Sequence, residues 1–170
     1  RALNWQGNKQ GLNETGRLRS YASAAVHSPI DRAIWISGIG EENLVRIPVT
    51  GPNRSLDIEA LQAAIDLDRA EGFIPAGFIA SVGSTSAGAT DDLEAALAVA
   101  KAEGLYTHVD AAWAGSAMIC PEFRHYWQGV ETADSVVFNP HKWLGAQFDC
   151  SAHFVADPES LVKTLAIQPE

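Results

Sequence analysis

An apolar run at residues 73–82 most constrains the fold, because it has the composition of a strand buried on both faces of a sheet. A loop of small residues, 83–88, follows it, and then comes a segment with helical spacing that ends at Gly104. A second short β-like run leads to Val109. Strand, helix and strand in this order make a βαβ unit, which needs a parallel sheet with helices packed on it. The fold class predicted is therefore α/β.

The helix of this unit is predicted from a single apolar face made of Leu93, Ala96, Leu97 and Ala100, with Thr90 or Asp91 as its N-cap. Elsewhere the pattern indicates a second helix at residues 57–70 and a strand with its turn at 44–53. It also indicates a short apolar segment at 33–36 and a polar loop or linker at 4–16.

Composition and charge narrow the class of protein. The 170 residues are 46% hydrophobic and 19% charged, which is typical of one soluble globular domain. The net charge of -9 argues against nucleic acid or an anionic membrane surface as a partner, because both attract clustered Lys and Arg. Two cysteines make no disulfide framework, and no apolar run approaches the ~20 residues of a membrane span. We expect a cytoplasmic protein.

A lysine and an aspartate follow two of the predicted strands. Lys142 lies in a polar turn after the apolar residues 136–138, and Asp110 ends the β-like run 107–109. Carboxyl ends of parallel strands meet at one edge of a sheet, so we expect Thr85, Asp110 and Lys142 to share that edge. A lysine amine can form an imine with an aldehyde, and a carboxylate keeps a pyridine nitrogen protonated. Pyridoxal phosphate needs both groups.

Each of these residues taken singly has an ordinary structural explanation. A lone lysine at a strand end is usually solvated, and a lone aspartate there caps a turn or a helix. A metal site is a second chemical alternative, because His108 and Asp110 point to the same face of a strand and His125 or His141 could join them. Spacing alone is weak support for that alternative. The aromatic residues within 123–127 are more typical of a core or an interface than of a substrate site.

Longer motifs resemble one family. HVDAAWAGSAMICPEFRHYWQGVETADSV, from His108, and FNPHKWLGAQFDCS, from Phe138, resemble the pyridoxal-phosphate-dependent group II decarboxylases, in their aromatic-L-amino-acid (dopa and tryptophan) branch. The similarity covers nearly the whole chain, continuing upstream in Tyr21-Ala22-Ser23, His27-Ser28, Arg46-Ile47-Pro48 and Gly83-Ser84-Thr85-Ser86. The resemblance implies the large domain of a fold-type I transferase-like α/β protein, with a mostly parallel sheet flanked by helices.

The resemblance also assigns roles to single residues. Lys142 matches the lysine that carries pyridoxal 5'-phosphate, and Asp110 matches the acid that pairs with its pyridine nitrogen. His27 matches a histidine that stacks on the ring and influences proton transfer to the substrate. These three are the expected catalytic residues. Four further positions match residues that contact the cofactor or lie beside its lysine: Thr85, Ala112 under the ring, Asn139 at the phosphate and His141.

The activity that the resemblance implies is decarboxylation of an aromatic L-amino acid to its amine and carbon dioxide, the work of a carboxy-lyase. Three alternatives stay open: an aldehyde synthase, a decarboxylase of another amino acid, and a non-catalytic fragment that binds the cofactor. Trp113 departs from the tyrosine expected in animal members, which leaves the choice among tryptophan, dopa, tyrosine and phenylalanine open.

Length is the largest departure from the family, whose members run to several hundred residues. We therefore interpret residues 1–170 as the central part of the cofactor-binding large domain, without the N-terminal segment and the C-terminal small domain. Such a fragment is expected to be inactive alone. The full-length protein is expected to be a homodimer with a small-molecule amino-acid substrate.

Overall fold

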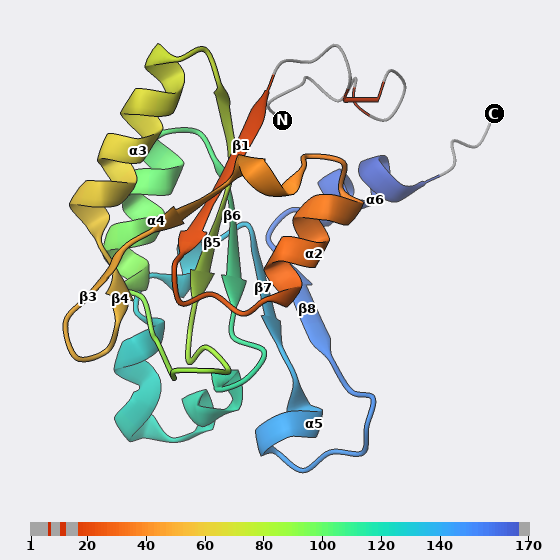
Figure 1. Cartoon of the computed structure of the whole chain (residues 1–170). Helices are drawn as coiled ribbons and strands as arrows, with labels where there is room; N and C mark the ends of the chain where they lie inside the picture. Colours follow the sequence, from red (N-terminus) through yellow and green to blue (C-terminus); the bar gives the residue numbers. More distant parts are fainter. Residues whose placement is uncertain (1–6, 8–10, 13–16, 167–170) are drawn as a thin grey trace.

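A six-stranded sheet forms the centre of the protein (Figure 1). The computed structural model describes residues 7, 11–12 and 17–166, so the predicted loop or linker at 4–16 lies largely outside the described residues. Every neighbouring pair of strands is parallel except the last, which is antiparallel. In order across the sheet the strands are β2 (Leu44–Ile47), β1 (Leu18–Ser23), β5 (Ile74–Ser81), β6 (Tyr106–Asp110), β7 (Ser135–Phe138) and β8 (Ala152–Val155).

Helices lie on both faces of the sheet, which confirms the predicted α/β class. On one face lie α3 (Ile58–Ala70) and α4 (Leu93–Ala102), and on the other lies α2 (Pro29–Ile36) (Figure 1). The one-turn helix α5 (Pro140–Trp143) follows β7, and α6 (Pro158–Leu165) follows β8. Connections contain short 3-10 helices at Glu41–Asn43, Gly115–Ile119, Pro121–Trp127 and Val130–Thr132, and a two-stranded sheet of β3 (Val49–Thr50) and β4 (Ser55–Leu56). In the part of the chain that the structure describes, no helix has both the length and the apolarity needed to cross a membrane.

Most predicted elements form where the sequence pattern places them. The helix predicted over 57–70 is α3, capped by the Asp57 carboxylate, which accepts a backbone hydrogen bond from the first turn at 3.0 Å. The strand predicted from residue 44 forms β2 and β3, with Pro48 between them. The short apolar segment 33–36 is the second half of α2.

The predicted cap of α4 is wrong. Asp92 is the N-cap, because its carboxylate accepts a hydrogen bond from the Ala95 N–H at 3.1 Å. The neighbouring carboxylate, Asp91, is buried and accepts hydrogen bonds from the N–H groups of Leu56 and Ser81, each at 2.8 Å. Burial raises the pKa of the Asp91 carboxyl group. Asp91 therefore joins β4 to the end of β5.

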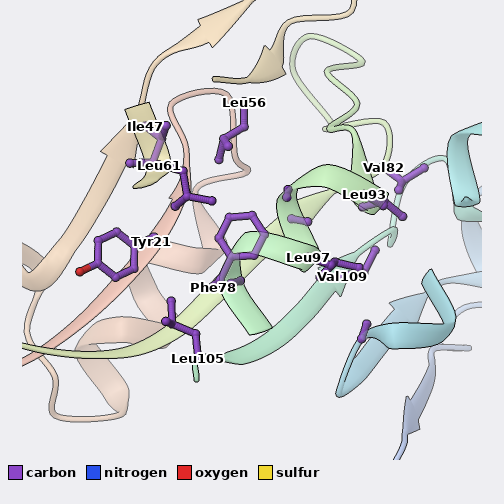
Figure 2. Packing of buried hydrophobic residues seen from close by; sticks show 14 of the residues in the cluster. Tyr21, Ile47, Leu56, Leu61, Phe78, Val82, Leu93, Leu97, Leu105 and Val109 are labelled. Atoms are coloured by element: carbon purple, nitrogen blue, oxygen red, sulfur yellow. The ribbon is translucent and has the colours of Figure 1, made fainter. Parts of the chain in front are cut away.

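Alternation of side chains along β1 and β5 separates the apolar residues into two clusters. Tyr21 and Phe78 belong to the cluster that contains residues of α3 and α4, whereas their neighbours Ala22 and Ile79 belong to the cluster around α2. Phe78 is 1% exposed, and burying a side chain of this size contributes about 2–3 kcal/mol. Figure 2 shows the larger cluster, which also includes Ile47, Leu56, Leu61, Val82, Leu93, Leu97, Leu105 and Val109.

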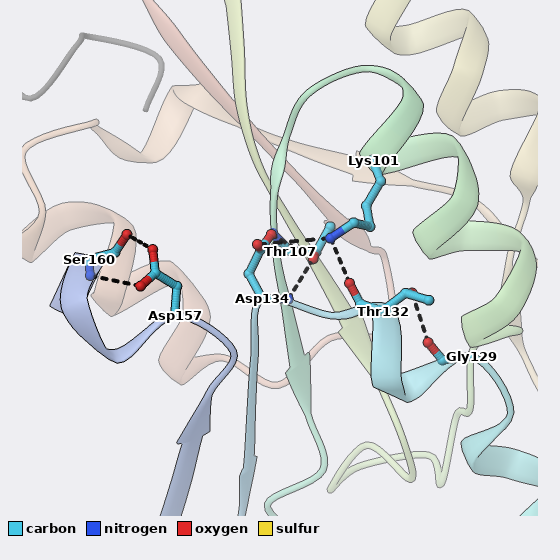
Figure 3. Close-up of polar contacts among 7 residues, drawn as sticks. All are labelled: Lys101, Thr107, Gly129, Thr132, Asp134, Asp157 and Ser160. Carbon is cyan, nitrogen blue, oxygen red and sulfur yellow. Dashed lines mark hydrogen bonds and ion pairs between the residues drawn. The ribbon is translucent and has the colours of Figure 1, made fainter.

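A buried carboxylate joins the amino ends of β6 and β7 (Figure 3). Asp134 accepts hydrogen bonds from the N–H of Thr107 at 2.9 Å and from its hydroxyl at 3.0 Å. The Thr107 hydroxyl oxygen in turn accepts from the Asp134 N–H at 3.0 Å. Lys101 of α4 has its Nζ 3.9 Å from an Asp134 carboxylate oxygen and donates to the Thr132 carbonyl at 2.7 Å. One carboxylate therefore connects two strands and a helix.

We predict that Asp134→Ala lowers the free energy of unfolding by about 2–4 kcal/mol, because it leaves two buried donors of Thr107 without their acceptor. Urea denaturation measures the change. The control is Asp157→Ala, which removes the exposed N-cap of α6 (Figure 3) and should cost only about 1 kcal/mol. Equal losses for the two variants would contradict the prediction.

Candidate functional site

The predicted site residues follow strands that end at the same edge of the sheet. Strands β1, β5, β6 and β7 are parallel, so their carboxyl ends lie together at the lower edge in Figure 1. This confirms the expected placement of Thr85, Asp110 and Lys142, which follow or end β5, β6 and β7. His27 follows β1 and lies at this edge as well. We call it the site edge.

Asp110 is fixed by the strands on both sides of it. Its carbonyl accepts a hydrogen bond from the Val82 N–H at 3.0 Å, and in the register of the sheet it lies opposite Ser81 and Val137. One carboxylate oxygen accepts from the Ala112 N–H at 3.1 Å. The carboxylate is half-buried. Asp110 therefore presents a negative charge at a position that the backbone determines.

His108 lies on the same face of β6 as Asp110, two residues earlier. Its Nδ1 is 2.8 Å from the Ser135 hydroxyl oxygen, and its ring meets the ring of His153 edge-on, with centroids 5.9 Å apart. Burial is the main cause that lowers the pKa of His108, and it outweighs the opposing effect of Asp110. Sequence reasoning missed the link to Ser135, although the two-residue period of β6 already placed His108 beside Asp110.

The polar turn predicted to hold Lys142 is the one-turn helix α5. Pro140 occupies the first turn, and the Lys142 N–H donates to the Asn139 carbonyl at 3.0 Å. The Lys142 Nζ lies 5.8 Å from the centroid of the Trp113 ring, which meets Trp143 edge-on with centroids 6.2 Å apart. The amine therefore lies near the Trp113 ring, which in turn contacts Trp143.

In the described structure, the other predicted residues lie at the site edge without side-chain hydrogen bonds to Asp110 or Lys142. His27 and Ala112 are half-buried, and Thr85 is exposed in the loop after β5. Within the described residues, no hydrogen bond joins the side chain of His27 or Thr85 to Asp110 or Lys142. His141 bonds through Nδ1 to the backbone of Cys150. The described residues contain no cluster of three or more His, Cys, Asp or Glu that could hold a metal ion.

Two glycines let the loops of the site edge approach one another closely. A Cβ at Gly83, after β5, would lie 2.2 Å from the Ala114 Cβ, and the φ of Gly83 is +68°. A Cβ at Gly115, after β6, would lie 2.8 Å from the Cβ of Phe138 at the end of β7. Side chains at these positions would push the loops apart, so the closeness of the three strand ends depends on glycine.

Buried polar atoms with unused hydrogen-bonding capacity gather on the same loops. The hydroxyls of Ser84 and Ser116 and the Asn139 side-chain oxygen are buried and have no partner within the described structure. The oxygen and nitrogen of an amide can exchange places by rotation, so Asn139 can present a donor as well. Together with the Lys142 amine, this set of groups fits a polar, anionic ligand that carries an aldehyde, as pyridoxal phosphate does.

Comparisons with known proteins agree with this fit. A family profile described as the pyridoxal-dependent decarboxylase conserved domain matches residues 3–170. A phenylacetaldehyde synthase from Petunia hybrida is 44% identical over 163 residues, which are 95% of this chain and 32% of that protein. A tyrosine decarboxylase from Papaver somniferum is 43% identical over 164 residues, 96% of this chain and 32% of that protein.

The fold also matches that of a solved protein structure. The crystal structure of Oryza sativa TDC with PLP and tryptamine matches with a TM-score of 0.91 and 38% identity, covering 99% of this chain and 35% of that chain. The chain thus spans about a third of the length of the proteins that it resembles.

We predict that His108 titrates below the usual histidine pKa of about 6.5, because burial disfavours the charged ring. The unfolded chain then binds the proton more readily than the folded one. The free energy of unfolding should be highest above about pH 6.5 and should fall as the pH drops below this value towards the folded pKa. His108→Asn keeps a polar atom near Ser135 and should reduce this dependence. NMR titration of His108 gives the check, and a pKa above the usual value would contradict it.

Proposed function

Because the chain belongs to the pyridoxal-dependent decarboxylase family, we propose that it is part of the cofactor-binding large domain of an enzyme that decarboxylates an aromatic L-amino acid. The products are the amine and carbon dioxide. The observation that carries this proposal is the one sheet edge shared by an amine, Lys142, and a carboxylate, Asp110. An amine and a carboxylate are the two protein groups that prepare pyridoxal phosphate for amino-acid chemistry.

Lys142 and Asp110 serve opposite ends of the cofactor in this proposal. Lys142 holds it covalently through Nζ, and the Asp110 carboxylate holds a proton at the pyridine nitrogen by charge attraction. When bound, pyridoxal phosphate supplies an electron sink for the charge left on the substrate as carbon dioxide departs. Burial lowers the pKa of His108, which favours the uncharged ring beside Asp110.

The remaining candidate residues hold the ligand in place. Asn139 and Thr85 supply hydrogen bonds at the site edge, with the Asn139 amide assigned to the phosphate. Ala112 would leave room for the cofactor ring, because its side chain is small. His27, which lies after β1, would stack on that ring and could move a proton near the α-carbon of the substrate. These roles rest on the family resemblance and on the common position of the residues.

An aromatic substrate is supported by two observations. The indole ring of Trp113 lies 5.8 Å from the Lys142 amine and contacts the ring of Trp143, and Trp113 is 38% exposed, so an apolar surface is accessible there. The similar proteins include a tyrosine decarboxylase. A second candidate activity is aldehyde synthesis, because a phenylacetaldehyde synthase is as similar to this chain as the decarboxylase is. Chromatography of the product as amine or aldehyde distinguishes the two.

The proposal also includes a homodimer in the cytoplasm. Large apolar side chains are exposed on the 3-10 segments after β6, at Met118, Ile119 and Phe123, and these offer a surface for a second subunit. Cys120 and Cys150 are free thiols, which suits a reducing compartment. Sedimentation of the purified protein tests the dimer.

We predict that the wild-type protein gains a cofactor absorbance band with pyridoxal phosphate and that Lys142→Ala does not. Borohydride reduction followed by mass spectrometry should place the cofactor on the peptide that contains Lys142. The matched control is Lys163→Ala in α6, which should keep the band. A wild-type protein without the band, or an adduct on another lysine, would contradict the assigned role of Lys142.

We predict that in the full-length enzyme Asp110→Asn lowers kcat by roughly 10²- to 10⁴-fold, the range for losing a group that controls a proton in catalysis. Asparagine keeps an acceptor for the Ala112 N–H, so the fold should survive. Attachment of the cofactor to Lys142 should persist, which separates this variant from Lys142→Ala. Carbon dioxide release from tryptophan, tyrosine or dopa gives the measurement, and a kcat close to wild type would exclude Asp110 as the partner of the pyridine nitrogen.

A further inference from the structure

The segment after α5 folds back onto the helix that carries Lys142. We call residues 144–151, between α5 and β8, the return segment. The Cys150 N–H donates a hydrogen bond to His141 Nδ1 at 3.0 Å, and the His141 N–H lies 3.4 Å from the Cys150 carbonyl oxygen, to which it donates. The same Nδ1 is 2.8 Å from that carbonyl oxygen, so it either accepts from the Cys150 N–H or, when protonated, donates to the Cys150 carbonyl, according to the tautomer of the ring. The backbone and the side chain of His141 therefore both hydrogen-bond to Cys150 in the return segment.

Further contacts surround the histidine ring. Phe148 meets it edge-on with centroids 4.8 Å apart, and the Asp149 carboxylate lies 3.5 Å from Nδ1. The Ala146 N–H donates to the Pro140 carbonyl at 3.3 Å. Although α5 lies at the periphery of the protein, the His141 side chain is only 9% exposed. The imidazole thus lies between α5 and the return segment.

Helix α5 cannot hold its own orientation. It has four residues, and a single turn of helix is unstable without outside contacts. The Asn139 side chain makes no capping hydrogen bond to it. The orientation of α5, and with it the direction in which Lys142 leaves the backbone, therefore depends on contacts such as those of His141.

We propose that His141 is a positioning residue that fixes the Lys142 amine by holding the return segment through Nδ1. The other ring nitrogen, Nε2, stays available, so this role is compatible with a contact between His141 and the cofactor. The importance of this contact for catalysis rests on the proposed function of Lys142. The hydrogen bonding between His141 and Cys150 forms without the cofactor, so it is tested in the protein without cofactor.

The test compares two amide substitutions at residue 141. His141→Asn places an amide near the position of Nδ1, so it can still accept from the Cys150 N–H or donate to the Cys150 carbonyl, whereas His141→Gln places its amide near Nε2 and can do neither. Hydrogen–deuterium exchange of the return segment is measured without cofactor. His141→Gln should speed this exchange about five- to tenfold, as expected for the loss of one hydrogen bond, and His141→Asn should stay close to wild type.

The second readout is the reactivity of Lys142 itself. Acetylation by an N-hydroxysuccinimide ester, quantified on the peptide with Lys142, should change in His141→Gln and recover in His141→Asn, and attachment of pyridoxal phosphate should follow the same order. Unchanged exchange in His141→Gln overturns the proposal. Faster exchange with unchanged reactivity of Lys142 overturns it too, because the histidine then holds the segment without positioning the amine.

A separate variant covers the case in which His141→Gln does not fold, which fast exchange throughout β6 would reveal. Phe148→Ala alters a side chain that is 79% exposed and removes only its ring contact with His141. It should change exchange and acetylation in the same direction by a smaller factor, and no change in either would overturn the proposal. If the wild type fails to bind pyridoxal phosphate at Lys142, the proposed function fails, while exchange and acetylation still decide the role of His141.

Discussion

The pairing of β6 with β7 is the interaction on which the candidate site depends. Asp110 ends the first strand and Lys142 follows the second, so the register between the strands sets where acid and amine lie relative to each other. A slip by one residue would turn Asp110 to the opposite face. Asp134 and Thr107 secure this register from the opposite, amino end of the strands. The buried Asp134 carboxylate, at the opposite end of the strands, thus helps to keep the geometry of the site edge.

Much of this arrangement could be predicted from local patterns. Apolar runs and helical spacing identify β5, α3 and α4, and the rule that parallel strands end at one edge brings Asp110 and Lys142 together. These predictions succeed because they need only the order and direction of elements. The chemical roles of Lys142, Asp110, His27 and the cofactor-contacting residues came from the family resemblance, and they stay predictions.

The sequence could not predict interactions between distant residues. Asp91 and Asp92 are both suitable helix caps by pattern, and only the position of β4 explains why Asp91 is buried and Asp92 caps α4. The hydrogen bond between His108 and Ser135 spans 27 positions in the chain. The hydrogen bond between His141 and Cys150 depends on the conformation of the return segment. Such hydrogen bonds follow from the assembled sheet, and no local periodicity encodes them.

The reversed direction of β8 has a consequence for how the site can move. β8 pairs antiparallel with β7, so α5 and the return segment form a loop with both stems hydrogen-bonded in the sheet. The strand pairs fix both ends of this loop, so any movement of it is confined to residues between the two stems. Lys142 therefore lies on a part of the site edge that the sheet holds from both sides.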